Sequence, residues 1–377
     1  MVKIQNEQDI HDFVRGCTLM GTGGGGDPKD GIDWLRTALD EDLTLSFTPY
    51  EEVKDDAWTV CPFLMGSIAP RTEEAKQRMQ ALGLTKEPVK SIQAEAVRLL
   101  ESYTKAEIQA IVPIELGGSN TPGAVVAAAR LRVPIVDGDY TGRAIPEIPQ
   151  TTPYLNGLSL WPIASIDKYG NKAIITESTG YEMAERMGKF LAAASFGLAG
   201  QAGFLLKGKD MKRALIPKTL SKCLEIGRLI RTSRAAGRNP VEETVKQLNG
   251  WLLFEGHISN KEWEDKEGYY WGTHTLSGIG RFAGQEFKIW FKNENHISWL
   301  NGEPYVTSPD MIIVVDRESG EPFANSHIAE GHSVAVIGLR AVEQFRSPKG
   351  LDILGPPHFG FDIEYQPIET VAKRGEG

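Results

Sequence analysis

A run of glycines near the start of the chain restricts the folds that it can adopt. In segment 21–26, every residue except Thr22 is glycine. So many glycines together mark backbone that bends sharply or comes close to a ligand or to another segment. Asp27 and Pro28 follow, and these residue types are typical of a helix N-cap and of the first helical position. The loop therefore presents its N–H groups at a helix N-terminus, which is the outline of an anion-binding site.

The residues before the glycines predict a helix, because segment 6–20 repeats apolar side chains at helical spacing. A dinucleotide-binding fingerprint needs a strand at this place, and a Walker-A loop needs Gly-Lys-Ser/Thr directly after the glycines. Here Lys29 stands two residues after Asp27, and neither motif is complete. We predict a helix, a glycine turn and a second helix. The turn either binds a ligand or lets the two helices pack closely.

The next part of the chain predicts an α/β domain. Segment 108–114 is a short apolar strand, 122–131 is an alanine-rich helix with Thr121 as its N-cap, and 133–136 is another strand. This order predicts a βαβ unit in a partly parallel sheet. Ligands gather at the carboxyl ends of such strands. We therefore expect the strand ends and the glycine loop to face one crevice.

A proline-rich stretch over 145–162 predicts a linker. We therefore expect an α/β domain over 1–165 and a second domain over 166–377. In the second part, segments 181–199 and 219–230 have helical patterns. After residue 250, short apolar segments alternate with Gly, Asn, Asp and Pro, which predicts a β-rich α+β domain.

Composition favours a protein of the cytoplasm. The formal net charge of −9 argues against a general nucleic-acid binder. The start turns polar at once and no apolar run is long enough for a membrane span, so we expect neither a leader nor a membrane partner. Three widely spaced cysteines fit reduced thiols. Segment 205–238 carries ten Lys or Arg and two acidic residues; we favour pairing with the protein's own acidic surface over an anionic partner.

Two carboxylates follow the strand 133–136 directly. Asp137 and Asp139 can hold a metal, raise one another's pKa for acid–base catalysis, or bind an amide N–H of a substrate. The alternative is an Asx-rich turn in which they cap backbone N–H groups. Arg143 lies four residues further on, where it would bind a carboxylate or orient an Asp.

Other polar residues lie near the same predicted crevice. Glu115 and Asn120 follow the strand 108–114 and can recognise the donor and acceptor edges of a small polar ring, or else form a cap network. Cys17 lies one turn before the glycine loop, where a helix N-terminus can lower a thiol pKa. A nucleophile is one interpretation of Cys17, and a small core residue is the one we favour.

The histidines show no metal-binding motif by their spacing. Folding can still bring together side chains from consecutive β-type segments, to hold one divalent cation such as Zn. The alternative is ordinary surface or hydrogen-bonded histidines. The candidate ligands are His274, Glu294, His296 and His327.

Five segments carry longer motifs, in order along the chain: 16–28, 137–147, 292–295, 308–310 and 355–362. Together they resemble the S-methyl-thiohydantoin desulfurase family over about residues 10–366. The resemblance implies an N-terminal α/β domain joined near residue 165 to a C-terminal domain, and a small cyclic amide-like substrate.

The resemblance suggests a hydrolase for a hydantoin or S-substituted thiohydantoin ring, in which water displaces a thiol or opens the ring. Such chemistry needs an activated water, a donor to the developing negative charge and an anchor for the ring. A bound metal would lower the pKa of the water. The catalytic candidates are Asp139, Asp137 and Cys17, and the substrate-binding candidates are Thr22, Gly23, Gly24, Gly25, Glu115, Asn120 and Arg143.

Two other functions stay open at this point. The chain can be a nucleotide- or phosphate-dependent partner subunit of a hydantoinase- or oxoprolinase-type enzyme, with the glycine loop around the phosphates. It can also be a non-enzymatic assembly or sensor subunit whose β-rich half binds a partner. Homo-oligomer formation is a further open expectation.

Overall fold

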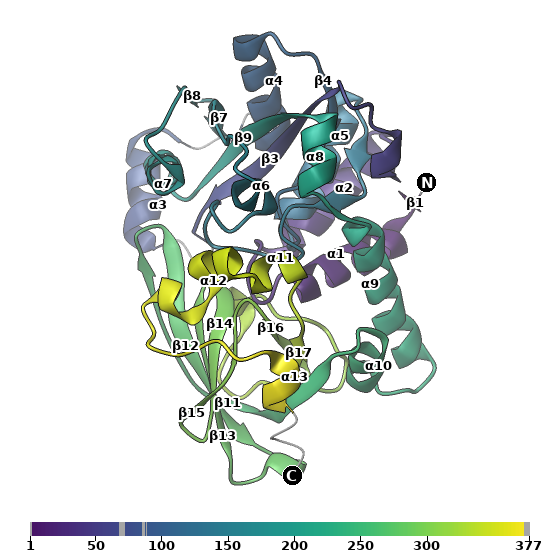
Figure 1. The fold of residues 1–377 in the computed structure, drawn as a ribbon, viewed down its shortest axis with the longest axis vertical. Coiled ribbons are helices and arrows are strands. Elements are labelled where there is room, and N and C mark those ends of the chain that lie inside the picture. The colour runs from purple at the N-terminus through teal and green to yellow at the C-terminus, as the bar shows by residue number, and fades with distance from the viewer. Residues whose placement is uncertain (1, 68–71, 85–86, 88, 373–377) are drawn as a thin grey trace.

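The computed structural model describes residues 2–67, 72–84, 87 and 89–372. An eight-stranded sheet with its helices forms the upper half of the view in Figure 1, and a seven-stranded sheet forms the lower half. Two hydrophobic clusters cover the two faces of the upper sheet, and a third belongs to the lower sheet. The fold class predicted from the sequence is confirmed.

The upper sheet contains the predicted βαβ unit. Its four central strands β2, β5, β4 and β3 are parallel, and α5 (Asn120–Leu131) connects β4 to β5. The N-cap of α5 is Ser119 and not the predicted Thr121, whose hydroxyl donates instead to the Glu115 carbonyl at 2.9 Å. In sheet order the strands are β1 (Val2–Ile4), β2 (Leu45–Thr48), β5 (Ile135–Val136), β4 (Ile108–Ile111), β3 (Trp58–Gly66), β9 (Leu198–Lys207), β7 (Ile163–Asp167) and β8 (Lys172–Ile175).

The helix, glycine turn and helix are present as predicted. Helix α1 (Glu7–Met20) leads into the turn, and α2 (Pro28–Asp40) follows it. Asp27 caps α2 by accepting from the Lys29 N–H at 2.9 Å, and Pro28 is the first helical residue. The other helices that accompany the upper sheet are α3 (Glu73–Ala81), α4 (Ile92–Thr104), α6 (Thr152–Leu155), α7 (Tyr181–Ala194) and α8 (Gly208–Ala214).

The proline-rich segment 145–162 is not an exposed linker. Most of its residues from 145 to 153 are buried, and it contains the short helix α6. The strands after it, β7 to β9, complete the upper sheet, so this sheet uses residues on both sides of position 165. The domain boundary near residue 165 stays a prediction.

The lower sheet is antiparallel and confirms the β-rich second half. Its long hairpin β11–β12 extends upward to a point just below α7 in Figure 1, and α12 and α13 lie along the same half. In sheet order the strands are β15 (Glu303–Thr307), β14 (Glu294–Leu300), β13 (Glu286–Lys292), β12 (Tyr269–Gly278), β11 (Trp251–Lys266), β17 (Ser333–Leu339) and β16 (Met311–Asp316). The remaining elements are β6 (Gly138–Asp139), β10 (Ile216–Pro217), α9 (Thr219–Ala235), α10 (Pro240–Gln247), α11 (Glu343–Arg346), α12 (Pro348–Leu354) and α13 (Ile368–Val371).

Helix α9 packs against α1 with the backbones almost in contact. A Cβ atom on Gly16 would lie 1.8 Å from the Cys223 carbonyl oxygen, and one on Gly227 would lie 1.7 Å from the Asp12 carbonyl oxygen. Only glycine allows this approach. No described helix is long and apolar enough to cross a bilayer.

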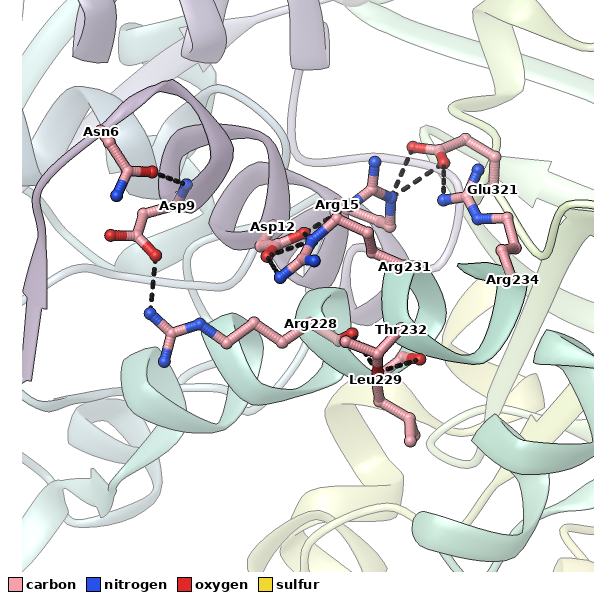
Figure 2. Close-up of polar contacts among 10 residues, drawn as sticks. All are labelled: Asn6, Asp9, Asp12, Arg15, Arg228, Leu229, Arg231, Thr232, Arg234 and Glu321. Atoms are coloured by element: carbon pink, nitrogen blue, oxygen red, sulfur yellow. Dashed lines mark hydrogen bonds and ion pairs between the residues drawn. The ribbon is translucent and has the colours of Figure 1, made fainter. Parts of the chain in front are cut away.

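The basic stretch 205–238 neutralises acidic residues of the protein itself. Figure 2 shows the arginines of α9 reaching α1 and the β16–β17 connection. Arg231 binds the fully buried Asp12 at 2.8 Å, and Arg228 binds Asp9 at 2.6 Å. Arg234 binds Glu321 at 2.7 Å. These pairs agree with the internal pairing favoured from the sequence.

Candidate functional site

A small polar cavity lies where the two halves of the molecule meet. It has a volume of about 80 Å³ and is bounded by the glycine loop, the end of β3, the β4–α5 connection, helix α7 and the start of β14. We call it the inner cavity. Its polar wall includes Glu115, Asn120, Glu147, Glu185, Lys189 and Glu294.

Glu115 comes from the carboxyl end of β4 and is held at both oxygens. Oε1 accepts from the Asn120 side-chain amide at 2.7 Å, and Oε2 accepts from the Ile145 N–H at 2.8 Å. Burial raises the pKa of Glu115 to about 7, although these two hydrogen bonds lower it. The carboxyl group therefore titrates near neutral pH, as a general acid or base should.

Asn120 fixes the orientation of this carboxyl. Its Oδ1 accepts from the Leu64 N–H at 3.0 Å and from the Gln93 amide at 3.3 Å, so its Nδ2 must face Glu115. Asn120 also lines the inner cavity, and its side chain bonds to Leu64, Gln93 and Glu115 rather than to the first N–H groups of α5. Its predicted ring-binding role stays a prediction.

Glu294 at the start of β14 has one paired and one free oxygen. Oε1 accepts from the Gly25 N–H at 3.2 Å, whereas Oε2 is buried without a hydrogen-bond partner among the described residues. The residue is 1 % exposed. Burial raises the pKa of Glu294 well above its ordinary value, and the nearby charge of Glu115 adds to this. These surroundings favour the protonated form of Glu294 in the cavity wall.

The glycine run explains how the backbone comes so close to Glu294. A Cβ on Gly24 would lie 1.8 Å from the Glu294 Oε1, and one on Gly25 would lie 2.4 Å from the Gly117 Cα. Gly25 also has a φ of +75°, which favours glycine. The loop thus binds a carboxyl group of the protein itself. Among the loop residues predicted to bind substrate, Gly25 lines the cavity. Thr22 contacts Arg143, and Gly23 contacts Asn325.

The opposite wall comes from α7. The Lys189 Nζ donates to the Gly66 carbonyl at 2.9 Å and lies 3.8 Å from the Glu185 Oε1. Glu185 accepts from the Ile148 N–H and from the Tyr269 hydroxyl, both at 3.0 Å. Burial lowers the pKa of Lys189 and raises the pKa of Glu185. The buried charges of this wall are therefore paired with each other and with backbone.

Glu147 differs from the other carboxyl groups of the cavity. It forms an ion pair with Lys292, and its Oε2 lies 2.6 Å from the His358 Nε2. Burial favours the neutral acid, but His358 and Lys292 outweigh it and hold the pKa of Glu147 at about 2. The cavity thus combines one carboxyl group whose pKa is lowered, that of Glu147, with three whose pKa is raised.

The predicted catalytic residues lie elsewhere. Asp137 accepts from the Ser221 N–H at 3.0 Å in the first turn of α9. Asp139 accepts from the N–H groups of the turn 141–142 at 2.9 and 2.8 Å, and burial raises its pKa to about 6. Cys17 is buried beside Cys223, and burial raises its pKa. The described residues that line the inner cavity include none of the three, and their catalytic roles stay predictions.

Arg143 bridges three chain segments instead of facing the cavity. Nη1 donates to the Pro309 carbonyl at 3.0 Å, and Nη2 donates to the Thr22 hydroxyl at 3.0 Å and to the Asn295 carbonyl at 3.2 Å. Burial lowers its pKa to about 10, so the guanidinium is still charged at neutral pH.

The predicted metal ligands are dispersed. His274 is buried and its Nε2 lies 3.1 Å from the Asn325 Oδ1, while His296 is buried with its ring centre 4.0 Å from that of Phe359. His327 pairs with Asp27 at 3.2 Å near the surface. Across the described residues, no group of three or more His, Cys, Asp or Glu side chains could hold a metal ion. A metal requirement stays a prediction.

The sequence interpretation gave no role to Glu185 and Lys189. They stand four positions apart on the same stripe of α7 as the small buried residues Ala184, Gly188 and Ala192. Two charged residues on the apolar stripe of an alanine-rich helix are a sequence signal for a functional site, because buried charges need a specific partner.

The raised pKa of Glu115 predicts a pH dependence of stability. Between pH 4.5, its ordinary pKa, and about 7, the folded protein holds a proton that the unfolded chain has lost. The free energy of unfolding must therefore fall as pH rises through this window. We expect Glu115→Gln to show a flatter fall than the unsubstituted protein, measured by urea unfolding across the window. Parallel curves for the two proteins would contradict the assignment.

Comparisons with known proteins give the family. The profile of the S-Me-THD-like N-terminal domain matches residues 8–177, and that of the S-Me-THD-like C-terminal domain matches residues 179–368. A crystal structure of a Chromobacterium violaceum protein, solved by the Northeast Structural Genomics Consortium, has a similar fold, with a TM-score of 0.75 at 19 % identity over 98 % of this chain and 100 % of that one. No curated protein matched significantly. The chain therefore belongs to the S-Me-THD-like family, in agreement with its resemblance to the S-methyl-thiohydantoin desulfurases.

Proposed function

We propose that the inner cavity is the active site of a hydrolase for a small cyclic amide-like ring of the hydantoin or S-substituted thiohydantoin type. The observation that carries the proposal is the pair of buried carboxyl groups in one cavity wall. Glu294 has a raised pKa and an Oε2 without a hydrogen-bond partner among the described residues, and the pKa of Glu115 is raised to about 7. The family name supports a thiohydantoin-related activity.

The two carboxyl groups complement such a ring. A hydantoin-type ring places carbonyl or imine acceptors next to N–H donors. The Glu294 acid donates to the oxygen or nitrogen on which negative charge develops, a role that a carboxyl group can fill only when burial keeps it neutral. The Glu115 carboxylate accepts a proton from the attacking water. Each of its oxygens already accepts one hydrogen bond, and each keeps a second lone pair for that proton.

For an S-methyl-thiohydantoin the reaction balances as follows. The water oxygen bonds to the ring carbon that bears sulfur, and the carbon–sulfur bond breaks. The two hydrogens of the water end on the departing thiol and on the ring nitrogen, passed through Glu115 and Glu294. The products are one oxo ring and one thiol. Ring opening of a hydantoin uses the same groups, with a carbon–nitrogen bond breaking instead.

The hydrolase proposal is tested with the purified chain alone. We expect the purified protein to release thiol from an S-methyl-thiohydantoin in step with formation of the oxo ring, without added nucleotide or subunit, measured with a thiol reagent and by mass spectrometry. Ring opening of hydantoin without thiol release would place the activity on the carbon–nitrogen bond. An absence of turnover on both rings, combined with thermal stabilisation by ATP, would overturn the proposal in favour of a nucleotide-dependent partner subunit.

A further inference from the structure

A second and larger cavity adjoins the inner one. It lies between α7 and the turn of the β11–β12 hairpin, which reach the same side of the molecule in Figure 1, and its volume is about 620 Å³. We call it the outer cavity. Glu147, Glu185 and Lys189 line both cavities, so the two meet at these side chains.

The outer cavity combines charged side chains with an apolar part that the solvent reaches. Met183 is 47 % exposed and Phe190 is 61 % exposed, and both are on the outward side of α7. Ala193 continues their stripe, and the Tyr269 ring faces it from the hairpin. Large apolar side chains gathered in an open hollow mark a place where an apolar group binds.

The charges at the junction are already satisfied. Tyr269 donates to Glu185, and the Lys189 and Lys292 ammonium groups lie 4.1 and 4.2 Å from the centre of its ring. Lys292 also pairs with Glu147. Further out, the Arg186 guanidinium lies 5.0 Å from the centre of the Phe190 ring. Glu182 and Glu267 also line the outer cavity, so its lining holds four carboxyl groups against the three cationic side chains Arg186, Lys189 and Lys292 and has little net charge.

We infer that the substrate ring carries an apolar substituent of amino-acid side-chain size, which occupies the outer cavity while the ring occupies the inner one. This inference rests on the proposed function. The volumes support it, because the outer cavity, at about 620 Å³, is larger than the inner one, at about 80 Å³, and has room for the substituent. Helix α7 serves both parts, with Glu185 and Lys189 toward the ring and Met183 and Phe190 toward the substituent.

The test compares two ring substrates that differ only in this group, one without a substituent and one with a benzyl group on the tetrahedral ring carbon. We expect a higher kcat/KM for the benzyl ring, and we expect Phe190→Ala to reduce the ratio of the two values about tenfold, the loss typical of removing apolar contacts from a pocket. Leu82→Ala is the matched control, because Leu82 is also 61 % exposed but lies at the end of α3, outside both cavities. The control should keep the ratio.

The outcomes separate this inference from the proposed function. Turnover of both rings with equal kcat/KM, or a ratio that Phe190→Ala leaves intact, overturns the inference and leaves the hydrolase proposal standing. An absence of turnover on both rings overturns the two together. Loss of the ratio in Leu82→Ala as well would also contradict the inference, because the effect would then come from general destabilisation.

Discussion

Glu294→Gln should lower kcat by about 10²- to 10⁴-fold, the range expected when a positioned acid or base is lost. Glutamine keeps the size of the side chain and keeps an oxygen that can accept from the Gly25 N–H. Its amide can still donate a hydrogen bond at the position of Oε2, but it cannot transfer a proton. Because burial favours the neutral form of Glu294, the uncharged glutamine suits the same buried position, and we expect the fold to persist.

A surface carboxylate provides the control for this variant. Glu286→Gln, at an exposed position of β13, should keep full activity. Turnover is measured as thiol release, and thermal unfolding of each variant confirms the fold. Unchanged turnover in Glu294→Gln would contradict the assignment of the acid. If Asp139→Asn then abolished turnover, the base role predicted for Asp139 from the sequence would be supported in place of the carboxyl pair.

Local sequence patterns were sufficient to predict the helices and strands that flank the site. Helical spacing before the glycines, the Asp-Pro pair after them and the strand-helix-strand order over 108–136 each depend on neighbouring residues, and the structure confirms all three. Glu115 and Asn120 follow from the same rule, since the carboxyl ends of parallel strands collect polar groups. This part of the site was therefore predictable.

Tertiary contacts decided the parts that the sequence did not reveal. Segment 181–199 has a helical pattern, yet its helix ends at Ala194 and β9 begins at Leu198. Gly200 in β9 is needed because a Cβ there would lie 2.5 Å from the Ile92 backbone where α4 crosses the strand. The local sequence of neither segment predicts that α4 crosses β9 at this point. The role of Lys189 likewise depends on the Gly66 carbonyl, which is distant in the sequence.

The glycine run shows why ligand binding and packing are hard to separate in a sequence. Ligand binding and packing both need backbone that approaches another group closely, so both require glycine at the same positions of the sequence. In the folded protein the approaching groups include Asn325, Glu294, Gly117 and Ser119. The loop therefore shapes the cavity by holding the acid group in place, and only Gly25 and Gly26 line the space itself.

Arg143→Met should lower the free energy of unfolding by about 3–5 kcal/mol, the usual cost of removing one partner from a buried charged network. The guanidinium is 2 % exposed and bonds to segments near residues 22, 295 and 309. Methionine fills a similar volume but leaves the carbonyl groups of Pro309 and Asn295 without this donor. It also removes a positive charge that favours the ionised forms of Glu115 and Glu294.

Arg340→Met is the control for Arg143→Met, because Arg340 is about half exposed and pairs with Glu343 and Glu369 at the surface. Its loss should cost less than about 1 kcal/mol. Urea unfolding measures both variants. If Arg143→Met unfolded like the unsubstituted protein but raised KM for a ring substrate, Arg143 would be the anion-binding residue predicted from its position after the strand. A large loss of stability would instead show that the Arg143 charge joins the two halves of the molecule, because Arg143 follows β5 of the upper sheet while its partners lie in the glycine loop and in the lower half.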